Sequence, residues 1–473
     1  STTPVSVVAL EPSLVLRLDY QKLLDYLAEI PQLLLNFIQD VGTAFKQTFA
    51  IDRLHTQPKV VLVAHESKTT RALTRGLIDR LQELGEKPCL MTNDSSWESR
   101  TDIPQVMLVR EGEWISDSDV RDQVAKWAAH ERVFIDVAAD IPRERLIRGI
   151  QLAELMLACA RISEIQPTLD RLRELTSLEQ EWREKIALVW WLEGSQMHVS
   201  PVSDLDQFVS RDFKVCLDPP PPKSGPVLNH GMERIVHRLR GVCVGIALGG
   251  GAARGMAHVG VLKVLEEQGV VVDMIAGTSA GAMTGTLYAS GMHTDYTVES
   301  FVNDLKLPWL FRHMRHGGYW YLLYKYRRKQ FKPMLEKYLS DLRLEQLPVA
   351  MSTITVDLVH GEPIVRDRGN AVDGILESIN LPGLSVPICR EGRALVDGGL
   401  VNNVPANVLV SKGCNFVIAV SVTAALEPNF ANIRPDGKSG KYRAPSVMET
   451  IMRGYLVQNV NMNSVGVQPA DLV

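Results

Sequence analysis

The chain has 473 residues, of which 45% are apolar and 22% charged, with 34 glycines and 25 prolines. This composition is typical of a globular protein and excludes a chain that is disordered, collagen-like or coiled-coil throughout. The 51 Lys and Arg residues against 55 Asp and Glu give a net charge of −4, so we expect no nucleic-acid partner. At about 100–200 residues per domain, the length predicts two to four domains.

The six cysteines lie far apart, and none forms a CxxC pair or groups with histidine at metal-ligand spacing. We therefore expect free thiols in a reducing, cytoplasmic compartment, with no metal and no cofactor. The chain begins at Ser1 without a methionine or a signal peptide, so we expect a piece of a longer protein. Its longest uncharged stretch, residues 274–294, is rich in Gly, Ser and Thr, and we interpret it as a strand, a turn and a helix instead of a membrane span.

Residues 1–46 predict two short strands followed by two helices. The segments 5–10 and 14–18 are rich in β-forming residues and are separated by Glu-Pro-Ser, a turn signal. The order of strand, strand, helix, proline and helix resembles the end of a cyclic-nucleotide-binding domain, without the part that would hold the cyclic phosphate. We expect a carboxyl-terminal remnant of such a domain and no nucleotide binding by this chain.

Residues 58–218 alternate apolar strands with amphipathic helices. We expect strands at 60–64, 89–91, 133–138 and 186–192, and a helix at 69–84. This alternation predicts a parallel sheet covered by helices. His65 and Ser67 follow the first strand. Capping of the next helix by Ser67 or Thr69 explains these polar residues better than a catalytic role does. We interpret this region as a smaller α/β module with a regulatory or structural role.

A proline-rich segment separates this module from the rest of the chain. Residues 218–225 contain four consecutive prolines, which favour a stiff, extended linker. A short helix is predicted at 233–239, so residues 219–240 form a linker and a lead-in helix. A further α/β domain is predicted at 241–473, with its core at 245–406, and it opens with a strand at 242–248.

A glycine-rich loop, Gly249 to Gly255, follows this strand and precedes a helix that Gly269 ends. A dinucleotide-binding loop would also place glycines here, but its GxGxxG spacing fails in both registers, and Asp273 precedes the second strand instead of following it. Backbone N–H groups at the start of a helix suit an anion, including one that exists only in a transition state.

The sequence GTSAG at 277–281 lies between a strand predicted at 274–276 and a helix at 282–289. GxSxG in this position predicts a nucleophile elbow, in which small residues allow a sharp backbone reversal that exposes the serine hydroxyl. Ser279 is therefore the candidate nucleophile.

A nucleophilic serine needs a proton acceptor. The last histidine is His360, so the chain order Ser, Asp, His of an α/β-hydrolase triad cannot be completed with Asp397. His258, on the helix after the glycine loop, has the spacing of a core-facing stripe, which predicts a packed histidine. Asp397 ends a strand predicted at 394–396 and precedes two glycines, which favours a dyad with Ser279.

The glycine loop, GTSAG and DGG together resemble the patatin-like phospholipase family. The strings ALGGGAARGMAHVGVLKVLEEQGVVVDMIAGTSAGAMTGTLYAS and ALVDGGLVNNVPA resemble its neuropathy-target-esterase branch. The resemblance covers about residues 241–422. It implies a patatin-like three-layer α/β/α catalytic domain and a serine esterase that hydrolyses acyl esters of phospholipids or lysophospholipids without a metal.

The resemblance also implies roles for individual residues, with Ser279 as nucleophile and Asp397 as proton acceptor. N–H groups of the glycine loop would hold the oxyanion, above all those of Gly250, Gly251 and Ala252. The wider set consists of the loop residues Gly250, Gly251, Ala252, Ala253, Arg254 and Gly255, the elbow residues Gly277, Thr278, Ala280 and Gly281, and the DGG glycines Gly398 and Gly399.

Members of this family usually have glycine where this chain has Ala252. Alanine keeps the backbone N–H but resists a positive φ, so a loop that needs this conformation is strained by about 1 kcal/mol or more. A catalytically impaired, lipid-binding regulatory protein of the same fold is therefore the alternative function.

Residues 309–332 hold eight aromatic and seven basic side chains and no acidic one. Interleaved aromatic and basic residues are typical of a phospholipid headgroup interface, which predicts peripheral membrane contact. A lid that packs these aromatic residues on the catalytic domain is the alternative.

Overall fold

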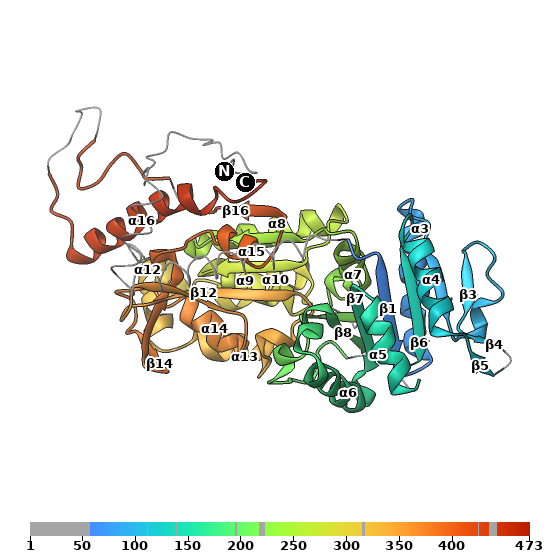
Figure 1. Cartoon of the computed structure of the whole chain (residues 1–473). Coiled ribbons are helices and arrows are strands. Elements are labelled where there is room, and N and C mark those ends of the chain that lie inside the picture. Colours follow the sequence, from blue (N-terminus) through green and yellow to red (C-terminus); the bar gives the residue numbers. More distant parts are fainter. Residues whose placement is uncertain are drawn as a thin grey trace, which may run out of the picture. The chain divides into compact units, whose positions relative to one another are not determined.

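Two seven-stranded sheets organise the protein (Figure 1). The computed structural model describes residues 57–110, 112–138, 141–193, 196–216, 223–314, 317–423, 425–434 and 442–473. The remnant predicted at 1–46 and the four prolines lie outside the described residues. The described residues from 57 onwards belong to one compact unit, and the division into domains at the predicted boundaries stays a prediction.

The first sheet is parallel throughout, in the order β3-β2-β6-β1-β7-β8-β9. Its strands are β1 (Val60–His65), β2 (Cys89–Thr92), β3 (Gln105–Met107), β6 (Val133–Ala138), β7 (Leu155–Arg161), β8 (Ile186–Leu192) and β9 (Arg211–Cys216). Between them lie α3 (Ala72–Glu83), β4 (Val109–Arg110), β5 (Glu113–Trp114), α4 (Asp117–Ala128), α5 (Arg143–Leu152) and α6 (Ile165–Leu178). The strands predicted at 60–64, 89–91, 133–138 and 186–192 are therefore confirmed.

Both faces of the first sheet are buried, which explains why its strands are continuous apolar runs. Along β1, Leu62 joins the hydrophobic cluster on one face, while Val61 and Val63 join the cluster on the other. Helix α7 (Gly231–Leu239), predicted as a lead-in helix, places Ile235 and Leu239 in this second cluster.

The second sheet is mixed, in the order β14-β15-β12-β11-β10-β16 with β13 also paired to β12. Its parallel core consists of β10 (Val244–Leu248), β11 (Met274–Thr278), β12 (Ala350–Asp357) and β16 (Phe416–Val420). Strands β13 (Glu362–Arg366) and β15 (Arg393–Asp397) pair antiparallel with β12, and β14 (Ile388–Arg390) pairs antiparallel with β15.

Helices cover both faces of the second sheet and make three layers. One face packs against α8 (Ala257–Glu267), α9 (Ala280–Ala289), α10 (Thr294–Leu305), α13 (Phe331–Leu339) and α14 (Ala371–Ser378). The other face packs against α15 (Ala406–Ser411). The predicted three-layer α/β/α architecture is therefore confirmed.

The uncharged stretch at 274–294 forms β11 and α9, as predicted. Every residue of α9 is buried, so this helix is the central one of its layer. None of the described helices combines the length and the hydropathy needed to cross a bilayer.

Candidate active site

Ser279 lies on a tight turn between β11 and α9. Its φ of 55° and ψ of −118° are rarely adopted by a side-chain-bearing residue, and this strained turn is the geometry of a nucleophile elbow. The flanking glycines permit it, because a Cβ on Gly281 would lie 2.0 Å from the Leu248 carbonyl oxygen, and a Cβ on Gly277 would lie 2.5 Å from the Gly281 carbonyl oxygen. The sequence pattern at 277–281 thus forms the turn it predicts.

Neighbouring groups fix the elbow in place. The Ser279 N–H donates to Ser378 Oγ at 2.9 Å, and Thr278 Oγ1 donates to the Asn402 carbonyl at 2.8 Å. Ala280 faces the glycine loop closely, because a Cβ added to Gly255 would lie 2.3 Å from the Cβ of Ala280. The nucleophile turn and the glycine loop therefore pack directly against each other.

Asp397 ends β15 and is fully buried. Its Oδ1 accepts hydrogen bonds from the Gly399 N–H at 2.8 Å and from Tyr455 Oη at 2.9 Å. No donor among the described residues meets hydrogen-bond geometry at Oδ2. The Ser279 hydroxyl is nevertheless near enough to lower the pKa of the carboxyl, so Oδ2 is the oxygen available to the serine proton.

Burial raises the pKa of Asp397 from 3.8 to about 6, against the lowering effects of Ser279, the Gly399 N–H and Tyr455. At pH 7 the carboxyl is therefore mostly ionised but more basic than an ordinary aspartate. A proton acceptor with a pKa close to the working pH suits general-base chemistry.

The glycine loop leads from β10 into a short 3-10 helix, Ala252–Met256, and then into α8. The prediction for its N–H groups needs one correction, because the Gly250 N–H donates to the Asn403 carbonyl at 3.1 Å and is not available to an oxyanion. The Arg254 N–H likewise donates to the Gly251 carbonyl at 3.1 Å. Within the described chain, no acceptor takes the N–H of Gly251 or Ala252.

Ala252 adopts a φ of 51°. This is the left-handed conformation that glycine, the usual residue of the resembling family at this position, adopts easily. It strains an alanine by about 1 kcal/mol. Ala252 and Ala253 are exposed at this turn, whereas Gly255 is buried.

His258 is buried in α8, as predicted, and its Nε2 lies 2.7 Å from the Gly249 carbonyl oxygen. Burial lowers its pKa, so the imidazole is neutral and donates this hydrogen bond. His258 thus supports the start of the glycine loop.

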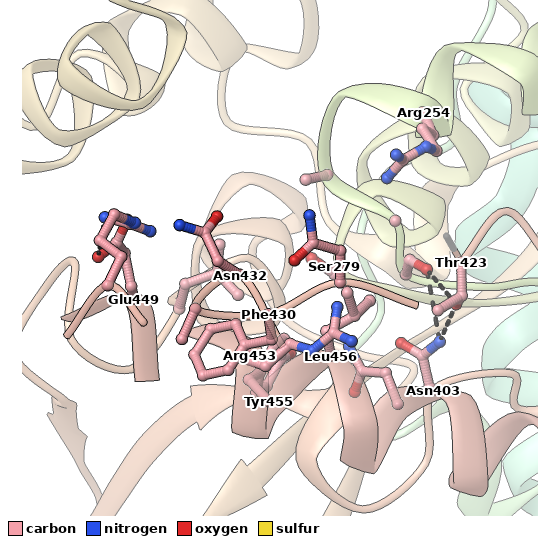
Figure 2. A pocket seen from close by; sticks show the side chains of 18 residues that line it. Arg254, Ser279, Asn403, Thr423, Phe430, Asn432, Glu449, Arg453, Tyr455 and Leu456 are labelled. Atoms are coloured by element: carbon pink, nitrogen blue, oxygen red, sulfur yellow. Dashed lines mark hydrogen bonds and ion pairs between the residues drawn. The ribbon is translucent and has the colours of Figure 1, made fainter. Parts of the chain in front are cut away.

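A cavity of about 530 Å³ opens beside Ser279 (Figure 2). Its walls are the glycine loop, Asn403, Thr423, the segment 429–432 and α16 (Val447–Gly466). Among the residues that the structure describes, no group of His, Cys, Asp and Glu could hold a metal ion.

Three arginines line this cavity, against one acidic residue. Arg443 pairs with Glu449 at 3.0 Å. Arg453 lies over the ring of Phe430, 5.6 Å from its centre, and donates from Nη2 to the Glu427 carbonyl at 2.7 Å. No described carboxylate pairs with Arg453, which lines the same cavity as Ser279 (Figure 2).

Two contributors to the site were not predicted from the sequence. Asn403 Nδ2 donates to the Gly250 carbonyl at 3.4 Å and to Asn463 Oδ1 at 2.7 Å, so it ties the glycine loop to α16. Tyr455 on α16 reaches Asp397 directly. Asn403 follows DGG within the family-like string, whereas Tyr455 lies in a helix without a recognisable motif.

The aromatic and basic segment forms α11 (Trp309–Arg312), α12 (Gly317–Arg327) and the start of α13. Trp309 is 73% exposed and Trp320 is 47% exposed. Phe331 is buried, and the Tyr326 hydroxyl donates to the Ile379 carbonyl. The segment thus contains both exposed aromatic rings and rings packed on the second sheet's helices.

Residues 246–410 match the family model described as Patatin-like phospholipase. The resemblance expected from the glycine loop, the elbow and DGG is therefore confirmed for this region. It includes Ser279 and Asp397 and leaves out α16.

The chain is also similar to several curated proteins. It is 30% identical over 216 residues to "Neuropathy target esterase sws" of Drosophila melanogaster, with 45% of this chain and 15% of that protein covered. It is 35% identical over 194 residues to "Lysophospholipase NTE1" of Mycosarcoma maydis, with 40% and 10% covered. An uncharacterized NTE family protein of Mycobacterium tuberculosis is 29% identical over 232 residues, with 45% and 38% covered. The chain thus spans well under half the length of each.

Proposed function

We propose that this chain is a serine esterase that hydrolyses acyl esters of phospholipids or lysophospholipids. The observation that carries the proposal is the placement of Ser279, on a strained elbow at the wall of a cavity and near enough to buried Asp397 to lower the pKa of its carboxyl. The Oδ2 of Asp397 has no described donor and is free to take the serine proton. The match of residues 246–410 to the patatin-like phospholipase model supports the same reaction class.

In the proposed mechanism, Asp397 Oδ2 takes the proton of the Ser279 hydroxyl while Oγ attacks the ester carbonyl. The N–H groups of Gly251 and Ala252 donate to the oxyanion that develops on the carbonyl oxygen. Asp397 then gives the proton to the departing alcohol, and water releases the fatty acid from the acyl-enzyme in a second step that uses the same proton acceptor.

The charge of the cavity supports an anionic headgroup on the substrate. Arg453 has a cationic edge in the cavity without a described carboxylate partner, and a guanidinium binds a phosphodiester through charge-assisted hydrogen bonds. The name of the relative from Mycosarcoma maydis, a lysophospholipase, points to a phospholipid substrate, and that of the relative from Drosophila melanogaster points to an ester.

Peripheral contact with a membrane is part of this proposal. The exposed rings of Trp309, Trp320 and Tyr324 lie on α11 and α12, a segment that carries basic side chains and no acidic ones. Amphipathic rings beside cationic groups suit the headgroup layer of a bilayer that supplies the substrate.

A catalytically impaired, lipid-binding regulatory protein is the second candidate. The observation that favours it is the positive φ of Ala252, since a strained alanine stands at one of the two free N–H groups. This candidate predicts lipid binding without turnover.

The test offers the purified chain a mixed pool of lysophospholipids and measures the fatty acids released. Wild type is expected to release fatty acid, and Ser279→Ala should lose at least about three orders of magnitude in rate. Ser67→Ala, a change beside the first sheet, is the control and should be as active as wild type. Full activity in Ser279→Ala would overturn the proposal, whereas folded wild type that binds the lipids without turnover would favour the second candidate.

A further inference from the structure

Tyr455 stands on α16, outside the region that matches the family model, yet its hydroxyl meets the proposed proton acceptor. Its Oη lies 2.9 Å from Asp397 Oδ1. A Cβ on Gly399 would lie 2.6 Å from the same Oη, so the second glycine of DGG leaves the space that the hydroxyl occupies. The absence of a side chain at Gly399 therefore permits this contact.

The Tyr455 hydroxyl is itself held from the other side. The side chain of Asn459, one turn further along α16, is near enough to this hydroxyl to oppose the rise that burial causes in the Tyr455 pKa. The Asn459 Oδ1 has no described partner, which leaves its amide nitrogen as the donor. A hydroxyl that accepts from Asn459 has its own proton free to donate to Asp397, because a carboxylate can only accept.

We propose that Tyr455 is a positioning residue for Asp397, an inference that rests on the proposed function. By occupying Oδ1 together with the Gly399 N–H, it turns Oδ2 towards Ser279 and keeps the carboxyl ionised at neutral pH. Helix α16 thereby completes a site whose other parts lie within residues 246–410.

The groups around Asp397 allow the effect of the Tyr455 hydrogen bond to be distinguished from a general loss of packing. The groups that shift the Asp397 pKa, apart from burial, are Ser279, the Gly399 N–H and Tyr455, and each favours the ionised form. Tyr326 on α12 is a second described phenol near this carboxylate, since burial and the charge of Asp397 both raise the Tyr326 pKa. The Tyr326 hydroxyl donates to the Ile379 carbonyl instead of to Asp397. No Lys, Arg or His of the described chain is among the groups that shift the Asp397 pKa.

The experiment compares pH profiles of kcat/KM for wild type and Tyr455→Phe on one lysophospholipid. Phenylalanine keeps the ring and removes the donor, so the acid limb of the profile should move up by about one pH unit. The resulting fall in kcat/KM should be about twofold at pH 7 and about tenfold below pH 6, because the Asp397 pKa of about 6 would rise to about 7. Tyr326→Phe is the matched control, because it removes a nearby hydroxyl that does not touch Asp397, and its acid limb should coincide with that of wild type.

An acid limb that is unchanged in Tyr455→Phe, or that moves equally in Tyr326→Phe, would overturn the inference. If Tyr455→Phe does not fold, Asn459→Ala serves instead, because it frees the Tyr455 hydroxyl to rotate away and should move the limb in the same direction by a smaller amount. An unmoved limb in Asn459→Ala then overturns the inference. Failure of the proposed function is distinct, since wild type itself would then show no turnover.

Discussion

The two sheets of this protein each bury an aspartate near the ends of their strands, and the surroundings of the two carboxyls are opposite. In the first sheet, Asp136 of β6 accepts from His65 Nε2 at 2.8 Å, Thr74 Oγ1 at 2.7 Å and Thr92 Oγ1 at 2.9 Å, so both of its oxygens are used. In the second sheet, Asp397 has both of its fixed donors on Oδ1, and Oδ2 is open.

The pKa directions follow this difference. Burial alone would raise the pKa of both carboxyls, but the donors around Asp136 bring its pKa below the ordinary value, whereas that of Asp397 rises to about 6. A buried carboxylate with all its partners stabilises the fold, and one with an open oxygen costs stability and can take a proton. The first site is therefore structural and the second is suited to chemistry.

Backbone strain divides the protein in the same way. Non-glycine residues with positive φ occur at Lys223 and beyond, and none occurs among the described residues of the first sheet and its helices. Ala252, Ser279, Ala431 and Asn432 are among these strained residues, and all four line the cavity. Strain that gathers around one cavity is typical of functional sites.

The largest expected effect separates the two aspartates. Asp397→Asn should lose about three to four orders of magnitude in kcat, because the amide cannot accept the serine proton. The same change should raise the free energy of unfolding by up to about 3 kcal/mol at pH 7, since it removes a buried charge whose pKa is raised from 3.8 to about 6. Ester hydrolysis and urea denaturation measure the two quantities.

Asp136→Asn is the partner variant. It should lower the free energy of unfolding by about 2 kcal/mol or more, because it breaks a fully used hydrogen-bond network, and it should leave the kcat of the folded protein unchanged. The comparison between the two sheets fails if both variants shift stability in the same direction.

The pH dependence is the next largest effect. As pH falls through about 6, Asp397 takes up a proton and can no longer act as acceptor, so kcat/KM should fall about tenfold per pH unit below that point. Protonation of Asp397 stabilises the fold, because its pKa is raised, so its cost to stability disappears between about pH 6 and pH 4. The stabilising gain of Asp397→Asn should shrink over the same window.

The contribution of Asp136 to stability changes with pH in the opposite direction. Its pKa is lowered, so its contribution to stability is present above the ordinary carboxyl range and is lost only as the pH falls below about 4.

Activity that is flat from pH 7 to pH 5 would contradict the assignment of Asp397 as proton acceptor.

Two arginines that lie over aromatic rings extend the comparison. Arg453→Gln should raise KM for a lysophospholipid about tenfold and leave KM for a neutral monoacylglycerol of the same chain unchanged, because only the first substrate has a phosphate. Arg145 in the first half lies over Trp114 and pairs with Asp117, so Arg145→Gln is the control and should change neither KM. Equal changes on both esters in Arg453→Gln would contradict a headgroup contact.

The smallest expected effect concerns strain in the glycine loop. Ala252→Gly should stabilise the protein by about half a kcal/mol and raise kcat/KM about twofold, because glycine adopts a φ of 51° without strain. Gly85→Ala is the mirror change, since Gly85 has a φ of 85° and ends a helix of the first sheet. It should destabilise by about 1 kcal/mol without changing kcat. A loss of activity in Ala252→Gly would show that the alanine is required.

Much of the fold could be predicted from local patterns. The strands at 60–64, 133–138 and 186–192 are long apolar runs between turn signals, and β10, β11 and β15 adjoin glycine motifs. Strands β3, β7 and β9 of the first sheet were not predicted. The side chains of β3 and β9 are partly polar or only partly buried, whereas β7 is a buried apolar run like the strands that were predicted.

The site was only partly predictable, for a related reason. Ser279 and Asp397 belong to short motifs whose spacing reflects local backbone geometry. Tyr455 comes from a helix about sixty residues after Asp397, and no local rule selects a tyrosine that reaches a carboxylate only after folding. The Gly250 N–H was assigned wrongly, because its acceptor, the Asn403 carbonyl, approaches only when β10 and the DGG loop meet.

The central claim is that Ser279 is a nucleophile activated by Asp397, and covalent labelling tests it most directly. The wild-type chain would be treated with a fluorophosphonate, digested, and its adduct located by mass spectrometry. We predict an adduct on Ser279, at a rate that declines below about pH 6 and is strongly reduced in Asp397→Asn. A folded protein that forms no adduct, or forms it elsewhere or at an equal rate in Asp397→Asn, would contradict the dyad.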